Sequence, residues 1–359
     1  MTHKMEMYYH YFQILFKIYS SVSVLLEYSK NLPLNKFGIF ALYFTQNCGY
    51  DYMKIVITGG AGFIASNIAD AYIALGHEVW IIDNLSTGKQ ENIPEKAHFV
   101  KMDVNDPAIH DLFSQEKFDI VNHHAAQMDV RVSVNDPSHD ARINILGGIN
   151  IYEAAKNSGV KKIIFASSGG TVYGEQEIFP ADESHPTKPI SPYGVAKLSN
   201  EHYLYYYYAV YGIPYVAFRY ANVYGPRQNP HGEAGVIAIF TQKLLAGQQP
   251  IINGDGLQTR DYVYVGDIVK ANELAISTDM HGAFNIGTSI ETDVNTLFRH
   301  LHSLIGATCS EQHIPAKTGE QRRSVLSYNH IHQQYGWEPS MEIRAGLDKT
   351  VEFFRVKST

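Results

Sequence analysis

A tyrosine and a lysine stand four residues apart in the segment Tyr193-Gly-Val-Ala-Lys197. On a helix, side chains four residues apart lie on one face, so the phenol and the amine would be neighbours. A free tyrosine has a pKa of about 10 and is a poor base at neutral pH. A nearby ammonium group favours the phenolate and makes the tyrosine a usable proton acceptor. The pair therefore predicts proton transfer, with Tyr193 and Lys197 as catalytic residues.

A glycine-rich turn far upstream predicts what accompanies that proton transfer. The apolar strand Lys54–Thr58 runs into Gly59, Gly62 and Ala65, which form a Gly-x-x-Gly-x-x-Gly/Ala register. Glycines at such a turn let the backbone approach a pyrophosphate, which the N-terminus of the following helix stabilises. A dinucleotide held beside the Tyr–Lys pair would move hydride and proton together. Its positively charged nicotinamide would favour the phenolate further, and Lys197 could hold the nicotinamide ribose.

An aspartate at the end of the next strand predicts which dinucleotide binds. Asp83 is placed to accept hydrogen bonds from the adenosine ribose hydroxyls and would repel a 2′-phosphate, so NAD is favoured over NADP. Asp103-Val104 follows the third strand and is expected to meet the adenine, while Ala125-Ala126 leaves room for the cofactor after the fourth. These expected cofactor-binding residues are Gly59, Gly62, Phe63, Ile64, Asp83, Asn84, Asp103, Val104, Ala125 and Ala126.

The elements that must position these residues alternate between strand and helix from Met53 onward. The pattern predicts strands at Lys54–Thr58, Glu78–Asp83, Ala97–Lys101, Asp119–His123, Lys162–Ser167 and Tyr215–Arg219, and helices at Phe63–Leu75, Asp106–Glu116, Ile143–Ser158 and Tyr193–Tyr211. Such alternation with short links is typical of a doubly wound α/β fold with a parallel sheet. We expect a Rossmann-type NAD domain at 53–222, to which later segments return, and a smaller substrate lobe at 223–359.

Composition excludes several classes of protein. A formal net charge of −7 argues against a nucleic-acid binder. Two cysteines, Cys48 and Cys309, make neither a disulfide framework nor a metal cluster, so a reducing cytoplasm is expected. The seventeen histidines show no metal-ligand spacing, and no metal is expected.

The first 52 residues differ from the rest. They are rich in Tyr, Phe, Ile and Leu with poor periodicity, and Lys17 and Glu27 interrupt an apolar run shorter than the ~20 residues that span a membrane. We interpret 1–52 as an added leader outside the fold and expect no stable membrane association.

Taken together, the motifs resemble the nucleotide-sugar epimerases of the extended short-chain dehydrogenase/reductase family, from Met53 to about Phe354. The segments that carry the resemblance are Thr58–Ile64, Asp83–Gly88, His123–Val134, Ser167–Gly174, Pro192–Lys197, Arg219–Pro226, Gly254–Gly256, Arg260–Val263 and Gly319–Ser324.

This resemblance implies NAD that is held tightly and not consumed, and a UDP-hexose substrate. Tyr193 would take the proton of the sugar 4-hydroxyl while hydride leaves C4, and the 4-keto sugar would turn before hydride returns to its other face. Asn144 would support the helix of Tyr193, and Asn144, Tyr193, Lys197 and Tyr220 would join the cofactor site. The implied substrate-binding residues are Gln127, Asn222, Ile251, Asn253, Arg260, Lys317, Arg322 and Ser324. A homodimer is expected as well.

The sequence departs from the family pattern at two positions, Ala65 and Gly169. Ala65 stands at the family's usual third glycine and tolerates helix–strand packing with slightly less room. The catalytic Ser/Thr of many epimerases aligns with Gly169, so Ser168, Thr171 or water would have to supply the hydroxyl. Dehydratases of the same fold carry Thr-Asp-Glu where this chain has Gly169, Gly170 and Thr171, which makes 4,6-dehydration a poor fit. Ser324 is small where epimerases restricted to plain hexoses are bulky, which leaves room for an N-acetyl group.

Two other functions stay open at this point. The chain could be a different NAD-dependent nucleotide-sugar enzyme, such as a uronate epimerase or a decarboxylase. It could also be a non-catalytic NAD-binding protein, a hypothesis that Gly169 motivates and that the intact Tyr193–Lys197 pair opposes.

Overall fold

The computed structural model describes residues 52–358, except 231–234 and 317–320. The leader predicted at 1–52 lies outside the described residues, apart from Tyr52.

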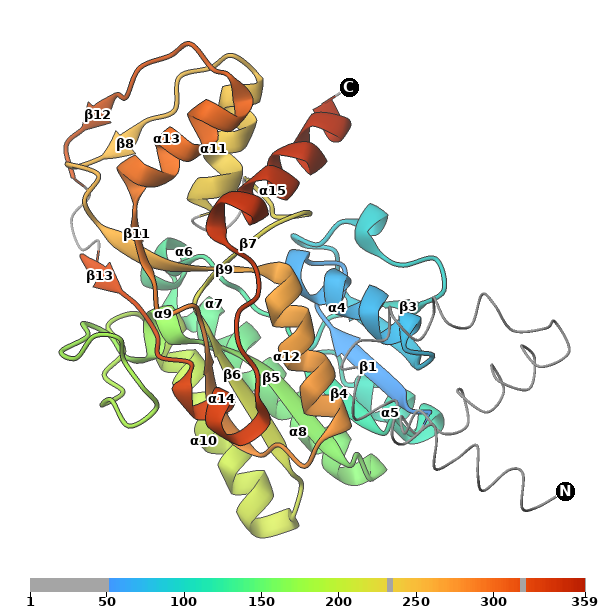
Figure 1. The fold of residues 1–359 in the computed structure, drawn as a ribbon. Helices are drawn as coiled ribbons and strands as arrows, with labels where there is room; N and C mark the ends of the chain where they lie inside the picture. Colours follow the sequence, from blue (N-terminus) through green and yellow to red (C-terminus); the bar gives the residue numbers. More distant parts are fainter. Residues whose placement is uncertain (1–51, 231–234, 317–320, 359) are drawn as a thin grey trace, which may run out of the picture. The chain divides into compact units, whose positions relative to one another are not determined.

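A seven-stranded parallel sheet forms the centre of the described chain (Figure 1). Its strands run in the order β10-β6-β5-β4-β1-β2-β3, with parallel pairing between all neighbours. Their bounds are β1 Lys54–Thr58, β2 Glu78–Asp83, β3 His98–Lys101, β4 Ile120–His123, β5 Lys162–Ser168, β6 Tyr215–Tyr220 and β10 Gly282–Ile286. This is the doubly wound order, in which ligands bind outside the carboxyl ends of the strands. The predicted α/β fold class is confirmed.

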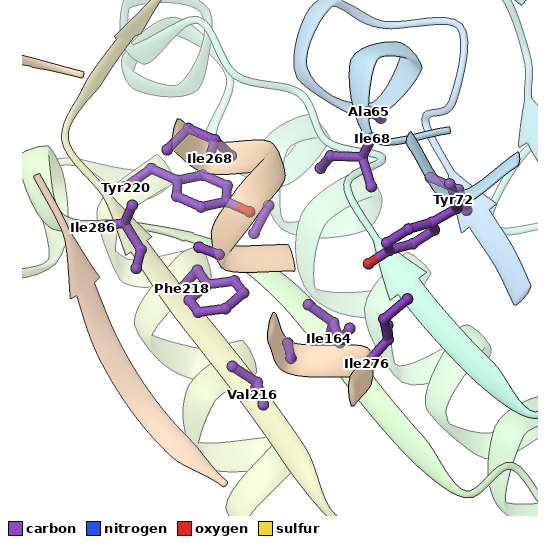
Figure 2. Packing of buried hydrophobic residues seen from close by; sticks show 14 of the residues in the cluster. Ala65, Ile68, Tyr72, Ile164, Val216, Phe218, Tyr220, Ile268, Ile276 and Ile286 are labelled. Carbon is purple, nitrogen blue, oxygen red and sulfur yellow. The ribbon is translucent and has the colours of Figure 1, made fainter. Parts of the chain in front are cut away.

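Helices cover both faces of the sheet, which is why its central strands are apolar on both sides. One face carries α4 Phe63–Ala74, α12 Val265–Ser277 and α14 Asn329–Tyr335. The other carries α5 Ala108–Glu116, α8 Gly147–Ser158 and α10 Pro192–Tyr211. Figure 2 shows the first of these layers, where Ile68 and Tyr72 of α4, Phe218 of β6 and Ile268 of α12 pack together.

Short strands and three helices form a smaller lobe with its own apolar core. The strands are β7 Asn222–Tyr224, β8 Ile252–Asn253, β9 Thr259–Tyr264, β11 Glu291–Asp293, β12 His313–Ile314 and β13 Arg323–Ser324, and the helices are α11 Val236–Leu245, α13 Val294–Ile305 and α15 Ile343–Ser358. In this lobe β9 pairs with β7, β11 and β13. Strand β10 and helix α12 come later in the chain than β7 to β9, yet they belong to the large sheet and its covering layer.

The segment 130–146 differs from the sequence-based expectation of a helix starting near Ile143. It folds into α6 Val130–Asn135, α7 Pro137–Ala141 and a π-helical turn η2 Arg142–Leu146 that leads into α8. Side-chain caps explain the extra helices, since Asp129 accepts from Arg131 N and Val132 N, and Asp136 accepts from His139 N. Two further short elements are η1 Gln90–Asn92 and α9 Gly169–Val172.

Candidate active site

The glycine-rich turn between β1 and α4 brings three backbone segments into contact. Gly59 has φ +70°, a left-handed conformation that glycine adopts without strain, and its N–H donates to Ile82 O at 2.8 Å. A Cβ atom on Gly59 would lie 2.7 Å from Ala125 N, so no other residue fits there. Gly62 caps α4 without a side-chain hydrogen bond. The first amides of α4 are therefore uncovered by a capping side chain, which suits the phosphates of a dinucleotide.

Asp83 lies at the end of β2 with its carboxylate fixed by two backbone amides. Oδ2 accepts from Ala61 N at 3.0 Å and Oδ1 from Leu85 N at 2.8 Å. The carboxylate is buried, because the turn of Ala61 and the segment up to Gly88 pack around it. An anion oriented in this way can accept hydrogen bonds from ribose hydroxyls and repels a 2′-phosphate.

The other residues expected around the adenosine half of the cofactor differ in burial and in hydrogen bonding. Asn84 Nδ2 donates to Asp103 Oδ2 at 2.7 Å, which ties two strand ends together. Burial acts to raise the pKa of Asp103, but hydrogen bonds from Asn105 and Asn84 outweigh it and lower the pKa below its usual value. Val104 is buried in the core of the sheet. Phe63 and Ile64 are half-buried at the start of α4.

Asn144 clamps the loop after β4 by its side chain. Its Oδ1 accepts from Gln127 N at 2.9 Å and its Nδ2 donates to Gln127 O at 2.8 Å. Asn144 lies in the π-helical turn, and its own carbonyl accepts from Asn200 Nδ2 of α10 at 2.9 Å. The loop that carries Ala125 and Ala126 is therefore tied to the helix that carries Tyr193.

Gln127 has little side-chain capacity left for a substrate. Its Nε2 donates to Asp129 O and to Asp140 Oδ1, and its Oε1 accepts from Asp129 N. Its assignment to the substrate site stays a prediction.

Tyr193 and Lys197 lie side by side on the buried face of α10. Lys197 Nζ is 5.6 Å from the centre of the Tyr193 ring and donates to Ala166 O of β5 at 2.7 Å. Helix α10 begins at Pro192, where Ser191 accepts from Gly194 N. Both side chains are almost fully buried. A buried ammonium beside a phenol favours the phenolate electrostatically.

The loop after β5 shows why position 169 carries no side chain. A Cβ atom on Gly169 would lie 2.3 Å from Leu326 Cδ1 and 3.1 Å from Arg219 O, so Leu326 fills that space. A Cβ atom on Gly170 would instead lie 4.0 Å from both Ser168 Oγ and Asn222 Oδ1. Ser168 and Asn222 therefore border the same space. The Thr171 hydroxyl lies 3.4 Å from Ser168 O, toward its own helical turn.

Tyr220 is held beneath this region by neutral groups. Its hydroxyl accepts from Asn272 Nδ2 at 2.9 Å and lies 3.4 Å from His124 Nε2. Burial raises the pKa of Tyr220 and lowers that of His124 to about 3, so both rings are uncharged at neutral pH.

Three expected substrate-binding residues meet in the small sheet around β9. Arg260 of β9 is the register neighbour of Ser324 in β13, and Asn222 of β7 pairs with Tyr262 two residues further along β9. Ser324 is buried. Arg260 Nη1 donates to Thr259 O at 2.8 Å.

The remaining expected substrate residues are more scattered. Ile251 and Asn253 lie at β8, and Asn253 O accepts from Gln258 Nε2. Arg322 forms a two-pronged ion pair with Asp255 at 2.8 and 2.9 Å, with both side chains exposed. Lys317 lies outside the described residues.

Sequence reasoning missed Ser133 and Asp140, which support the site from α6 and α7. Ser133 Oγ accepts from Tyr193 N at 3.3 Å, and Asp140 Oδ1 accepts from Asn144 and Gln127. The sequence did contain a signal for the start of α7. Asp136 is a capping residue, and it is followed by Pro137 at the first helical position.

Comparison with known proteins decides the family. The model of the NAD dependent epimerase/dehydratase family matches residues 55–287. This chain belongs to the NAD-dependent epimerase/dehydratase family. The family predicted from the motifs is thereby confirmed, and so is NAD as the cofactor.

Individual members of this family match most of this chain and all of their own length. The UDP-glucose 4-epimerase of Mycolicibacterium smegmatis is 42% identical over 85% of this chain and 100% of its own length. The structure of Thermotoga maritima UDP-glucose 4-epimerase with UDP-glucose is 45% identical, with a TM-score of 0.84 over 86% of this chain and all of that one. A UDP-N-acetylglucosamine 4-epimerase from Methanobrevibacter ruminantium, solved with UDP-N-acetylmuramic acid, is 35% identical, with a TM-score of 0.81 over 86% and 100%.

The described residues contain neither a membrane-spanning helix nor a metal-binding cluster. No helix within residues 52–358, gaps excluded, is both long and apolar enough to cross a membrane. Among the same residues, no group of three or more His, Cys, Asp or Glu side chains is arranged to hold a metal ion.

Proposed function

We propose that this protein is an NAD-dependent isomerase that interconverts UDP-hexoses epimeric at C4, through a transient 4-keto sugar. The observation that carries the proposal is the buried Tyr193–Lys197 pair beside the glycine-rich turn. The relatives named UDP-glucose 4-epimerase, which match over 85% and 86% of this chain and all of their own length, support the same reaction.

The glycine turn, the uncapped start of α4 and the buried Asp83 fit a tightly held NAD. Bound NAD supplies a hydride acceptor that becomes the hydride donor on the return step. In this mechanism the Tyr193 phenolate takes the proton of the sugar 4-hydroxyl and later returns it to the 4-keto oxygen. The Lys197 ammonium stabilises the phenolate and stays fixed to Ala166 O.

Ser168 is our choice for the hydroxyl that assists Tyr193. The usual position is closed, because Leu326 occupies the space of a side chain at Gly169. Ser168 Oγ borders the space above Gly170 together with Asn222, whereas Thr171 is turned toward Ser168 O. Ser168 can therefore hold the sugar oxygen while Tyr193 exchanges its proton.

The same loop favours epimerisation over elimination. A 4,6-dehydration needs an acid and a base near C5 and C6, and the stretch Gly169-Gly170-Thr171 offers no carboxylate. The 4-keto sugar has to rotate in the pocket so that hydride can return to its other face. The nucleotide must therefore be held firmly and the sugar loosely. Asn222 and Arg260, with Ile251 and Asn253 at the uracil, are proposed to hold the nucleotide.

The test is an assay of the purified protein without added cofactor on UDP-galactose, UDP-N-acetylgalactosamine and UDP-glucuronate. Conversion of UDP-galactose to UDP-glucose is the expected result. Conversion of UDP-glucuronate alone would instead favour a uronate epimerase or a decarboxylase. Absence of any turnover by protein that contains NAD would favour a non-catalytic NAD-binding protein.

We propose in addition that the protein is a homodimer and acts in the cytoplasm. Exposed apolar side chains on α10, including Val195, Tyr205 and Tyr206, support a second copy as the partner. The scarcity of cysteine supports a reducing compartment. Light scattering of the purified protein tests the dimer, and replacement of Tyr205 and Tyr206 by lysine should yield monomers.

A further inference from the structure

A row of polar side chains crosses the sheet beneath α10. Ser167 of β5, Arg219 of β6 and Asn285 of β10 are register neighbours on three adjacent strands. All three are buried. Side chains in one row of a parallel sheet point to the same face, and the contacts of this row identify that face as the one covered by α10.

Glu201 of α10 closes this row from above. Its carboxylate accepts from Arg219 Nη2 at 2.7 Å and from Arg219 Nε at 3.1 and 3.2 Å, and it also accepts from Ser167 Oγ. Arg219 Nη1 donates to Tyr173 Oη at 2.9 Å, and that hydroxyl donates to Asn285 Oδ1 at 2.7 Å. Every member of the network therefore has a directional partner.

A buried ion pair of this kind is weak evidence for stability, because desolvation offsets the attraction between the charges. A specific geometric role is the better explanation, since two-pronged arginine–carboxylate bonds fix distance and orientation. The position of Glu201 on α10 indicates that the ion pair fixes the placement of this helix on the sheet.

Tyr193, Lys197 and Glu201 follow one another at intervals of four residues and share the buried face of α10. Lys197 donates to Ala166 O, and Glu201 accepts from Ser167 Oγ. Two successive residues of β5 thus hold two successive turns of the catalytic helix. The next residue of β5 is Ser168, so the same strand also carries the proposed assisting hydroxyl.

We propose that Glu201 is a positioning residue: through Arg219 and Ser167 it sets the height and rotation of α10 on β5, and thereby the distance of Tyr193 and Lys197 from the reacting sugar. This inference rests on the proposed epimerase function. Neither Glu201 nor Arg219 needs to touch substrate or cofactor for it to hold.

The test replaces the pair as a unit, because removal of one partner alone leaves a buried charge unpaired. In the Glu201→Leu/Arg219→Met double variant the charges are gone but similar volume is kept. We expect a folded protein with wild-type NAD affinity and KM, and a kcat that is lower by about tenfold to a hundredfold, since displacement of a catalytic group by about 1 Å has effects of that size. The pH at which kcat is half-maximal should rise by about half a unit or more, because Lys197 Nζ stays bonded to Ala166 O of β5 while the Tyr193 ring moves with α10, which weakens the stabilisation of the phenolate.

Tyr207→Phe is the matched control. It removes a partly buried hydrogen bond of the same helix, from Tyr207 Oη to Glu153 at 2.7 Å, which joins α10 to α8 and not to β5. It should lower the melting temperature without changing kcat or its pH profile. Ser167→Ala, a smaller change, covers the case in which the double variant does not fold, and should lower kcat about threefold or more with the same sign of pH shift.

An unshifted pH profile with wild-type kcat in the folded double variant, or in Ser167→Ala, would overturn the proposal. Wild-type protein without epimerase activity would reject the proposed function instead. In that case, amide hydrogen exchange over residues 193–201 decides: faster exchange in the double variant than in Tyr207→Phe supports positioning, and equal exchange rejects it.

Discussion

The large sheet and the smaller lobe are constructed differently. The sheet has strands of four to seven residues, and all of its neighbouring strands are paired in parallel. The lobe has strands of two to six residues, and its longest strand, β9, pairs in parallel with β7 and β13 and antiparallel with β11. In the proposed mechanism, the sheet and its covering helices carry the groups that react, and the lobe carries groups that choose and hold the substrate. Substitutions in the two regions should therefore fail in different ways.

Tyr193→Phe should have the largest effect, confined to the chemical step. Positioned proton transfer contributes about 10²- to 10⁴-fold in rate, so kcat should fall by that factor while binding of UDP-sugar stays nearly intact. Steady-state kinetics with calorimetric titration of UDP-glucose measures both. Tyr203→Phe, the same change on the exposed side of α10, is the control. A kcat above about a tenth of wild type would remove Tyr193 from the role of base.

Asp83→Ala should weaken NAD binding by about tenfold or more and relax the exclusion of NADP, because the carboxylate both binds the ribose and repels a 2′-phosphate. Asp83→Asn separates the two effects, since it can keep an acceptor for Leu85 N without the charge. Dissociation constants for both cofactors give the result. An unchanged NAD preference in both variants would take Asp83 out of the cofactor site.

Ser324→Tyr should change which sugar is accepted and leave the chemistry alone. A bulky side chain beside Arg260 would exclude an N-acetyl group by steric clash, with a discrimination of about ten- to a hundredfold in kcat/KM between UDP-N-acetylgalactosamine and UDP-galactose. Ser324→Ala removes only the hydroxyl and should discriminate little. Equal losses on both sugars in the tyrosine variant would make Ser324 a structural residue.

Asp261 provides a pH test of the lobe. Burial raises its pKa from 3.8 to about 6, against hydrogen bonds from Thr288, Ser289 and Leu326 N. The folded state then binds the proton more tightly than the unfolded state, so this group stabilises the fold below about pH 4. Its contribution, about 3 kcal/mol, is lost as the pH rises through about 6. The destabilisation by Asp261→Asn should therefore shrink between pH 4 and pH 7. Urea unfolding across that range measures the free energy of unfolding of both proteins. A destabilisation by Asp261→Asn that grows from pH 4 to pH 7 would show that the raised pKa is wrong.

Removal of residues 1–52 should have the smallest effect. The family match begins at Ile55, and the described bond lost is an exposed one, from Tyr52 to Glu78 at 2.8 Å. A protein that begins at Met53 should keep NAD and wild-type kcat. Loss of NAD binding or of folding in that protein would show that the leader contributes to the enzyme.

The reach of local sequence patterns explains what the sequence could predict. Gly59, Asp83, Tyr193 and Lys197 could be predicted as site residues because local spacing alone places them at strand ends or on one helix face. The helices at 130–141 were missed, although Asp129 and Asp136 are ordinary caps. Their short length hides the apolar period that marks a longer helix.

Side-chain contacts between segments that are far apart in the chain were less accessible to such reasoning. No local pattern reports that Leu326 fills the space of a side chain at Gly169, or that Arg322 is paired with Asp255. The buried pair of Glu201 and Arg219 also joins two elements. A charged residue inside the otherwise apolar strand Tyr215–Tyr220 was the one available hint.

The late arrival of β10 has a consequence for biosynthesis. While the chain is being made, β6 emerges as an outer strand, and its partner Gly282–Ile286 follows only after the first strands of the lobe. During that interval the edge of β6, and the apolar side chains of Val216 and Phe218 that α12 will cover, are open to water and to other chains. Unpaired strand edges of this kind invite aggregation. A gene cut after residue 222 would make that transient exposure permanent, so an exchange of the substrate lobe between related enzymes has to carry its own β10 and α12, or graft around them.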